Sequence, residues 1–347
     1  MVAVAPASYL GALLHRAPDA GPEHAADVMT TMGIALWQAG AIDRAIGLLD
    51  SVRLSPGGHV WEADLLAARG MVSMCAGRPG PALADLDRAI GLVHLWRPST
   101  NQSRTYVLRS ATRYVLGDWD GAAVDAAAAR ALAESQAEKW SLAVALAISI
   151  DVPAGRGQWD IAADYLHRAG DAAPVVTAVA DLIARHSILL AVARADHEAV
   201  LDILDRTWSD AYLEREARTR ALRPVMHARV AAAIAVGRLA DAEKDILRYE
   251  HLLERWPRGP VPAGLGWLRG QLAEARGKPS QAQGQYAQEL ADPTLPEFPL
   301  QHAQLLHTSG RLEHALGNRR EAVDRLTRAR DVYMAMRLIP IEGVGGV

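Results

Sequence analysis

The amino-acid sequence predicts an all-α solenoid made of about eight helical hairpins of roughly 40 residues each. Three observations predict this fold class. One pattern of small and apolar residues recurs eight times along the chain, at spacings of 37 to 42 residues. Apolar residues follow a period near 3.6, and no stretch alternates as a strand does. Half of the 347 residues are hydrophobic and 22% are charged, which is the balance of a folded globular protein. We therefore expect tetratricopeptide-like hairpins stacked into a right-handed superhelix, without a β-sheet.

Each copy of the repeat is centred on one small residue, which we call the anchor. The anchors are Gly40, Gly77, Gly117, Gly157, Ala195, Gly237, Gly277 and Gly317. A glycine here is expected to end the first helix of a hairpin, because it adopts the left-handed conformation without steric cost. Five residues later, seven of the eight copies carry an alanine, such as Ala82, Ala122, Ala162 and Ala322. This residue lets the second helix lie close to the first, since a larger side chain would hold the helices apart.

A second small residue recurs seven positions before the anchor, in Gly33, Gly70, Ser110, Gly270 and Gly310. Together with the alanine, it resembles the tetratricopeptide repeat, lengthened from 34 to about 40 residues. We assign residues 25–340 to this repeat array, residues 1–24 to a lone N-terminal helix or partial repeat, and residues 341–347 to a flexible tail. Segments rich in proline and glycine separate repeats at 54–59, 97–103, 256–266 and 292–299. The third is the longest, so we expect flexibility there.

Composition and motifs exclude several classes of function. A net charge of −3 argues against a wholly basic nucleic-acid-binding protein. The single cysteine, Cys75, excludes an internal disulfide and a multi-cysteine metal site. No phosphate-binding loop, nucleophile elbow or zinc-protease motif is present, so we expect no cofactor, no metal and no enzymatic activity. No run of 18 apolar residues and no basic leader occurs, so we expect a cytoplasmic protein that does not contact membranes.

Several segments resemble, in the same order, the repeat region of a family of large bacterial regulators. These segments are residues 109–136, 152–169, 222–246, 266–286 and 307–340, and the family comprises the MalT-like, ATP-binding LuxR-family transcriptional regulators (LAL type) of actinobacteria. In that family an ATPase precedes the repeats and a helix-turn-helix follows them. This chain shows neither a Walker lysine nor a helix-turn-helix, so the resemblance implies ligand sensing or protein–protein signalling. It does not imply ATP hydrolysis or direct nucleic-acid binding by this chain. The alternative is a stand-alone tetratricopeptide scaffold or adaptor that binds a peptide or partner protein.

The first helix of each hairpin is expected to line a concave groove, with the residues ten, six and three positions before the anchor facing it. Near the C-terminus these positions form what we call the C-terminal polar set: Arg185, His227, Trp267, Gln271, Glu274, His307 and Arg311. Near the N-terminus they form the N-terminal apolar set: Ile34, Trp37, Met71, Met74 and Tyr114. We expect a protein or peptide partner, a small-molecule effector, or both, to bind the polar set, because placed polar groups give selectivity. The alternative is that the apolar set packs between repeats and the polar set is merely solvated. The sequence leaves self-association into a homo-oligomer open.

Overall fold

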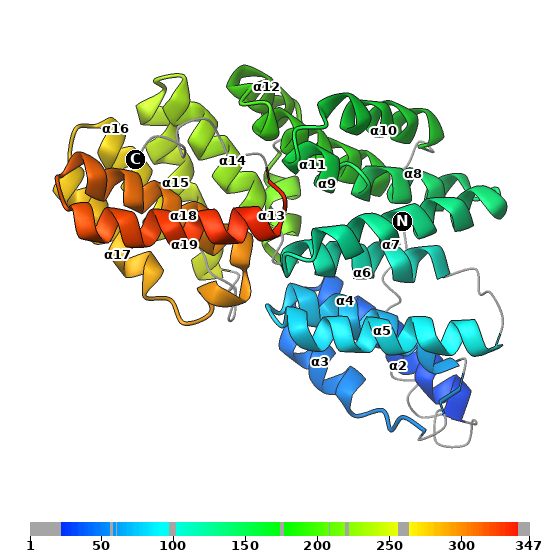
Figure 1. Ribbon diagram of the computed structural model, residues 1–347. Helices are drawn as coiled ribbons and strands as arrows, with labels where there is room; N and C mark the ends of the chain where they lie inside the picture. Colours follow the sequence, from blue (N-terminus) through cyan, green and yellow to red (C-terminus); the bar gives the residue numbers. More distant parts are fainter. Residues whose placement is uncertain are drawn as a thin grey trace.

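The computed structural model describes residues 22–55, 58–59, 61–96, 102–173, 177–207, 209–218, 222–255 and 264–338. Within these ranges all regular secondary structure is helical, and successive helices pair into eight hairpins (Figure 1). The predicted all-α fold class is therefore confirmed. The expected flexible tail lies outside the described residues, as do nearly all of the expected N-terminal helix and most of the break at 256–266. None of the described helices is both long and apolar enough to cross a lipid bilayer.

We number the hairpins 1 to 8 in chain order. Hairpins 1 to 4 comprise α2 (Pro22–Gln38) with α3 (Ile42–Asp50), α4 (Trp61–Cys75) with α5 (Pro79–Trp96), α6 (Gln102–Val115) with α7 (Trp119–Ser135), and α8 (Lys139–Ile148) and α9 (Asp151–Gly155) with α10 (Trp159–Ala172). Hairpins 5 to 8 comprise α11 (Thr177–Ala193) with α12 (His197–Thr207), α14 (Leu222–Ala235) with α15 (Leu239–Arg255), α16 (Leu265–Ala275) with α17 (Pro279–Leu290), and α18 (Pro299–Ala315) with α19 (Arg319–Ala335). A short 3₁₀ helix, η2 (Leu295–Glu297), precedes hairpin 8.

The anchors lie in the turns between paired helices, as predicted. The seven anchor glycines all have positive φ, between 70° and 84°, and Ala195 has a φ of 54°. The alanines five residues after the anchors are buried: Ala82 and Ala162 are 0% exposed, and Ala122 and Ala322 are 1% exposed. Both predictions are confirmed. The turn and the close helix crossing therefore arise from the same short motif.

Two departures from the regular repeat were not predicted. The first helix of hairpin 4 is interrupted between α8 and α9, because Pro153 has no N–H and its ring would clash with the carbonyl of Ser149. In hairpin 5, α12 has only 11 residues, whereas α7, α15 and α19 have 17. An additional helix, α13 (Asp210–Arg218), follows α12 and packs Tyr212, Leu213 and Ala217 into the same core as Leu204 of α12. It thus supplies apolar area that the short second helix lacks.

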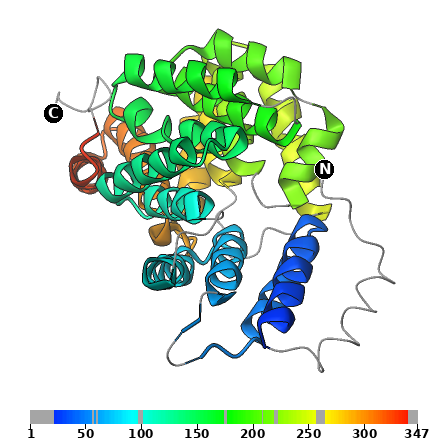
Figure 2. The same ribbon diagram turned by 90° about the vertical axis from the view of Figure 1, so that its right-hand side faces the viewer.

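The array also bends back on itself, so that hairpin 8 contacts hairpins 3 and 4 (Figures 1 and 2). Met336, only 2% exposed, shares a cluster with Trp119, Ala122 and Val152. The guanidinium of Arg156 donates two hydrogen bonds to the Met336 carbonyl, from Nε at 3.3 Å and Nη2 at 3.2 Å. We call this the closing contact. It joins residues 180 positions apart in the sequence.

An ion-pair network surrounds the closing contact. The carboxylate of Asp120 accepts a hydrogen bond from Arg156 Nη2 at 2.8 Å and lies 3.3 Å from Arg337 Nη1. Both pairs are exposed on the Asp120 side, so they add little stability by themselves. Among the side chains that hairpin 8 contributes to this cluster, Met336 is buried, whereas Leu300, Val332 and Leu338 are partly buried.

Replacing Met336 by aspartate should open the closing contact, because it removes the apolar contacts of Met336 with Trp119 and Val152 and puts a charged group into their cluster. The expected result is a larger radius of gyration in small-angle X-ray scattering. The helical circular dichroism signal should be retained, since each hairpin packs chiefly on its neighbours. Met334→Asp is the matched control, because Met334 lies on the same turn of the chain and is 68% exposed. An unchanged radius of gyration in Met336→Asp would show that other contacts hold the ends together.

Candidate functional site

Two aromatic members of the C-terminal polar set lie together in the structure. The rings of His227 on α14 and Trp267 on α16 meet edge to face, with centroids 5.1 Å apart and an interplanar angle of 63°. One hairpin further along, the ring of His307 on α18 lies edge-on to Tyr333 of α19, at 6.1 Å and 82°. His227, Trp267 and His307 each occupy the position ten residues before the anchor of their hairpin. We call these three residues the row, because they lie at equivalent positions of successive hairpins.

Several polar atoms along this row are buried without a hydrogen-bond partner among the described residues. They are the indole Nε1 of Trp267, Nε2 of His307 and the hydroxyl of Tyr333. His307 is 9% exposed and Tyr333 is 6% exposed. A buried donor or acceptor left unpaired costs about 1–3 kcal/mol, so native proteins satisfy nearly all of them. Three such atoms lie on hairpins 7 and 8, and together with the ring contacts they make this row a candidate binding surface.

The protonation states along the row follow from burial. Burial, assisted by the nearby Arg311 guanidinium, lowers the pKa of His307. The imidazole is therefore neutral near pH 7 and offers one donor and one acceptor nitrogen. Burial, together with a hydrogen bond from its hydroxyl to Glu274, raises the pKa of Tyr286 far above its usual value. Burial likewise raises the pKa of Tyr333. Both phenols remain protonated donors at physiological pH.

The remaining members of the polar set differ in their exposure to solvent and in their ion pairs. Glu274 and Arg311 are exposed at the edge of the row, and Gln271 is half-buried. Arg185 donates a hydrogen bond to Glu216 on the additional helix α13, so its charge is already compensated. The structure thus brings His227 and Trp267 into contact, whereas Arg185 forms an ion pair with Glu216.

The N-terminal apolar set lies largely in packing between hairpins. Met71 is 8% exposed, and Ile34 and Trp37 pack against the same cluster, which includes Ile42 and Leu49. Tyr114 stacks on Trp119, with centroids 4.7 Å apart and an interplanar angle of 15°, within the cluster of the closing contact. Met74 Sδ lies 3.3 Å from the Thr112 hydroxyl. These contacts correspond to the inter-repeat packing that the sequence left as the alternative.

The structure also shows a recurring polar contact that sequence reasoning missed. Eight residues before an anchor lies an arginine, and eight residues after the same anchor lies an aspartate. The pairs are Arg69–Asp85, Arg109–Asp125 and Arg229–Asp245, with N···O distances of 2.6 to 3.1 Å. Each arginine also pairs with an aspartate of the preceding hairpin, respectively Asp50, Asp87 and Asp205. We call each such group a staple, because it joins both helices of one hairpin to the hairpin before it. The signal was present in the sequence as an Arg–Asp separation of 16 residues.

Comparisons with known proteins bear on the fold. No model of a protein family matches the sequence, and no curated protein is similar to it. Among solved structures, the chain is similar to a Rap protein complexed with Competence and Sporulation Factor, with a TM-score of 0.62, 11% identity, and coverage of 90% of this chain and 98% of that chain. It is also similar to human IFIT1, solved as a dimer with m7Gppp-AAAA, with a TM-score of 0.56, 14% identity, and coverage of 88% and 72%.

At such low identity these likenesses show the fold alone. Within the part of the chain that the structure describes, no group of three or more His, Cys, Asp or Glu side chains could hold a metal ion. The protein is a tetratricopeptide-like α-solenoid.

The staple in hairpin 6 should contribute measurably to stability. In Arg229→Met, the Asp245 carboxylate, only 7% exposed, loses its main partner, and removing one member of a buried pair costs about 3–5 kcal/mol. Because Arg229 is partly solvated, the lower end of that range is expected in urea unfolding. Arg238→Met is the matched control, since Arg238 forms an exposed pair with Glu198 at 3.6 Å and should change stability by less than about 1 kcal/mol. Equal effects of the two variants would contradict the buried staple.

Acid should destabilise the protein in part through His307. The unfolded imidazole titrates near pH 6.5, whereas the folded pKa is lower, so the unfolded state binds the proton first. The contribution of neutral His307 to the free energy of unfolding is therefore complete above about pH 6.5. It is lost as the pH falls through the pKa of His307 in the folded state. In His307→Asn, the difference between urea midpoints at pH 7.5 and pH 5 should shrink. The exposed His167 on α10, replaced by asparagine, serves as the matched surface control.

Proposed function

We propose that the chain is a non-catalytic repeat domain that binds a protein or peptide partner along the concave side of hairpins 5 to 8. The observation that carries the proposal is the row of His227, Trp267 and His307, with its buried and unsatisfied Trp267 Nε1 and His307 Nε2. An extended peptide presents carbonyl oxygens and amide groups at regular intervals, and these suit a row of neutral donors and acceptors. The exposed Glu274 and Arg311 at the edge of the row would then favour peptides that carry complementary charges.

In its finer form, the proposal is that the domain is the sensor region of a MalT-like, LuxR-family regulator. The support for this is the ordered set of similar segments along residues 109–340. The two structural neighbours are each seen in complex with another molecule, which agrees with a binding role for this fold. A stand-alone scaffold would use the same surface. A Walker motif or a helix-turn-helix in the same reading frame would distinguish the regulator from the scaffold.

The test is a selection of peptides from a random phage-displayed library against the wild-type protein. Selected peptides should bind Trp267→Ala at least tenfold more weakly, by analogy with nucleic-acid bases, for which losing an aromatic stacking partner costs about 1–3 kcal/mol. Trp140→Ala is the matched control, since Trp140 lies on α8 and is 44% exposed. Selected peptides that bind Trp267→Ala as tightly as the wild type would overturn the assignment of this surface.

A further inference from the structure

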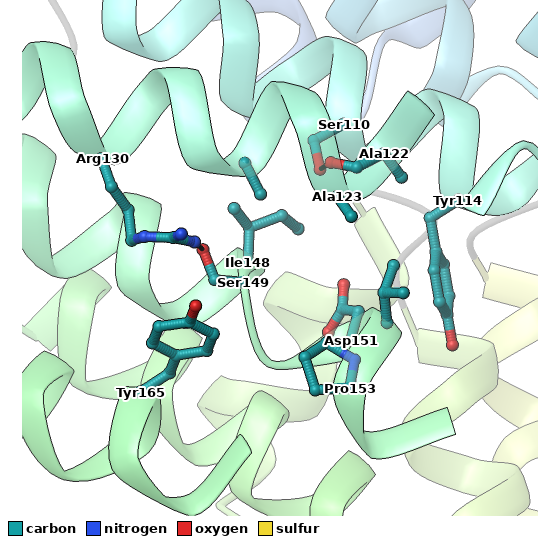
Figure 3. A pocket seen from close by; sticks show the side chains of 12 residues that line it. Ser110, Tyr114, Ala122, Ala123, Arg130, Ile148, Ser149, Asp151, Pro153 and Tyr165 are labelled. Carbon is teal, nitrogen blue, oxygen red and sulfur yellow. Dashed lines mark hydrogen bonds between the residues drawn. The ribbon is translucent and has the colours of Figure 1, made fainter. Parts of the chain in front are cut away.

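Hairpin 4 is one of the five hairpins without a staple, and a cavity lies at the positions that a staple would occupy. The positions eight before and eight after Gly157 are Ser149 and Tyr165, in place of arginine and aspartate. Around them lies a cavity of about 70 Å³ between α7, the broken helix α8–α9, and α10 (Figure 3). Ala122, Ala123 and Ala126 of α7 form one wall, and the interruption of the helix next to Ser149 widens the space. The cavity therefore follows from two local features, the missing staple and the break before Pro153.

An arginine from the preceding hairpin reaches into this space. The Nη1 of Arg130 donates a hydrogen bond to Ser149 Oγ at 2.5 Å, and its guanidinium carbon lies 4.5 Å from the centroid of the Tyr165 ring. Figure 3 shows the guanidinium extending from α7 towards Ser149, with the Tyr165 ring beneath it. The staple arginines each pair with two carboxylates. Arg130, in contrast, has no acidic partner among the described residues. The guanidinium of Arg130 therefore carries a positive charge that no carboxylate in the described part of the chain pairs with, and it has further N–H groups that can donate hydrogen bonds beside the cavity.

A carboxylate lies on another side of the same cavity. Asp151 is 7% exposed, and its Oδ1 lies 2.6 Å from Nδ1 of His186, which is 3% exposed. Its other oxygen, Oδ2, has no hydrogen-bond partner within the described parts of the chain. The cavity thus combines a cationic donor and an anionic acceptor in separate places, with small apolar side chains between them.

From this arrangement we infer that the cavity is a binding site for a small amino acid in its zwitterionic form. The carboxylate would accept hydrogen bonds from Arg130, since guanidinium groups pair strongly with carboxylates. The ammonium group would donate to Asp151 Oδ2. Since one water needs about 10–15 Å³ of such volume, the cavity holds only a few non-hydrogen atoms, which suits glycine, alanine or serine. A phosphate or a dicarboxylate would be repelled by Asp151.

The inference is independent of the partner-binding surface proposed above. That surface lies on α14, α16 and α18, whereas this cavity lies between hairpins 3 and 4. Either assignment can fail while the other stands, because different residues carry them.

The test is isothermal titration calorimetry of the full chain with glycine, with acetate and methylamine as probes that each keep one of the two charges. Glycine should bind saturably at one molecule per chain, and acetate and methylamine should bind at least tenfold more weakly. Arg130→Met, which keeps an unbranched apolar stem and removes the guanidinium group with its charge, should weaken glycine binding at least tenfold. Arg168→Met is the matched control, because Arg168 also links α10 to α7 through Glu134 but is 43% exposed and does not line the cavity.

A second variant tests the cavity without altering its charges. Ala123→Leu should fill the space and abolish glycine binding, while helical circular dichroism reports whether the fold is retained. The inference is overturned if glycine does not bind the wild-type protein, if acetate binds as tightly as glycine, or if a folded Arg130→Met or Ala123→Leu variant binds glycine as the wild type does.

Discussion

The close crossing of two helices within each hairpin is the constraint on which the rest of the structure depends. A side chain at the recurring glycine seven residues before the anchor would collide with the facing apolar residue. A Cβ added to Gly33 would lie 2.7 Å from Leu49, and one added to Gly70 would lie 2.9 Å from Leu86. Together with the buried alanine five residues after the anchor, this closeness sets the angle between the helices. Each hairpin then presents a similar surface to the next, and stacking can continue along the chain.

Polar contacts determine how rigidly the hairpins join. A staple holds three helices through one arginine. In two of the staples the aspartate of the same hairpin, Asp125 or Asp245, is buried, so removing the arginine would leave that charge unpaired, whereas the aspartate of the preceding hairpin is about half exposed. Apolar stacking alone could slide, whereas a bidentate arginine–carboxylate pair has a fixed geometry. Hairpin 4 is one of the five hairpins without a staple, and its first helix is also interrupted between α8 and α9. The cavity beside Arg130 lies where these two features coincide.

Local features of the fold could be predicted from the sequence, and contacts between distant segments could not. The anchors and the buried alanines follow from the conformational freedom of glycine and from helix packing within a single hairpin. The closing contact at Met336 depends on the curvature accumulated over six hairpins, which no local pattern records. The interruption at Pro153 is a local effect of proline, but the cavity beside it also involves Arg130, which lies in another hairpin.

For the candidate surface too, only the features that follow from the repeat pattern could be predicted from the sequence. Counting positions from the anchors assigned His227, Trp267 and His307 to one row, and in the structure the rings of His227 and Trp267 meet edge to face. The pairing of Arg185 with α13 could not be foreseen, because α13 lies outside the repeat pattern. The staples were accessible in principle as an Arg–Asp separation of 16 residues, but only three of the eight hairpins carry this pair. A signal present in a minority of repeats is easily overlooked in a single sequence.

The closing contact also has a consequence for how the chain acquires its structure during synthesis. Contacts between neighbouring hairpins are short-range, so a solenoid can form progressively as it leaves the ribosome. Trp119 and Val152, however, remain without their last partner until Met336 has been made. The nascent chain therefore passes through a stage in which most hairpins are stacked while an apolar patch at hairpins 3 and 4 is still exposed to solvent. Loss of the final hairpin, by truncation or stalled translation, would leave this patch permanently uncovered and available for association with other chains.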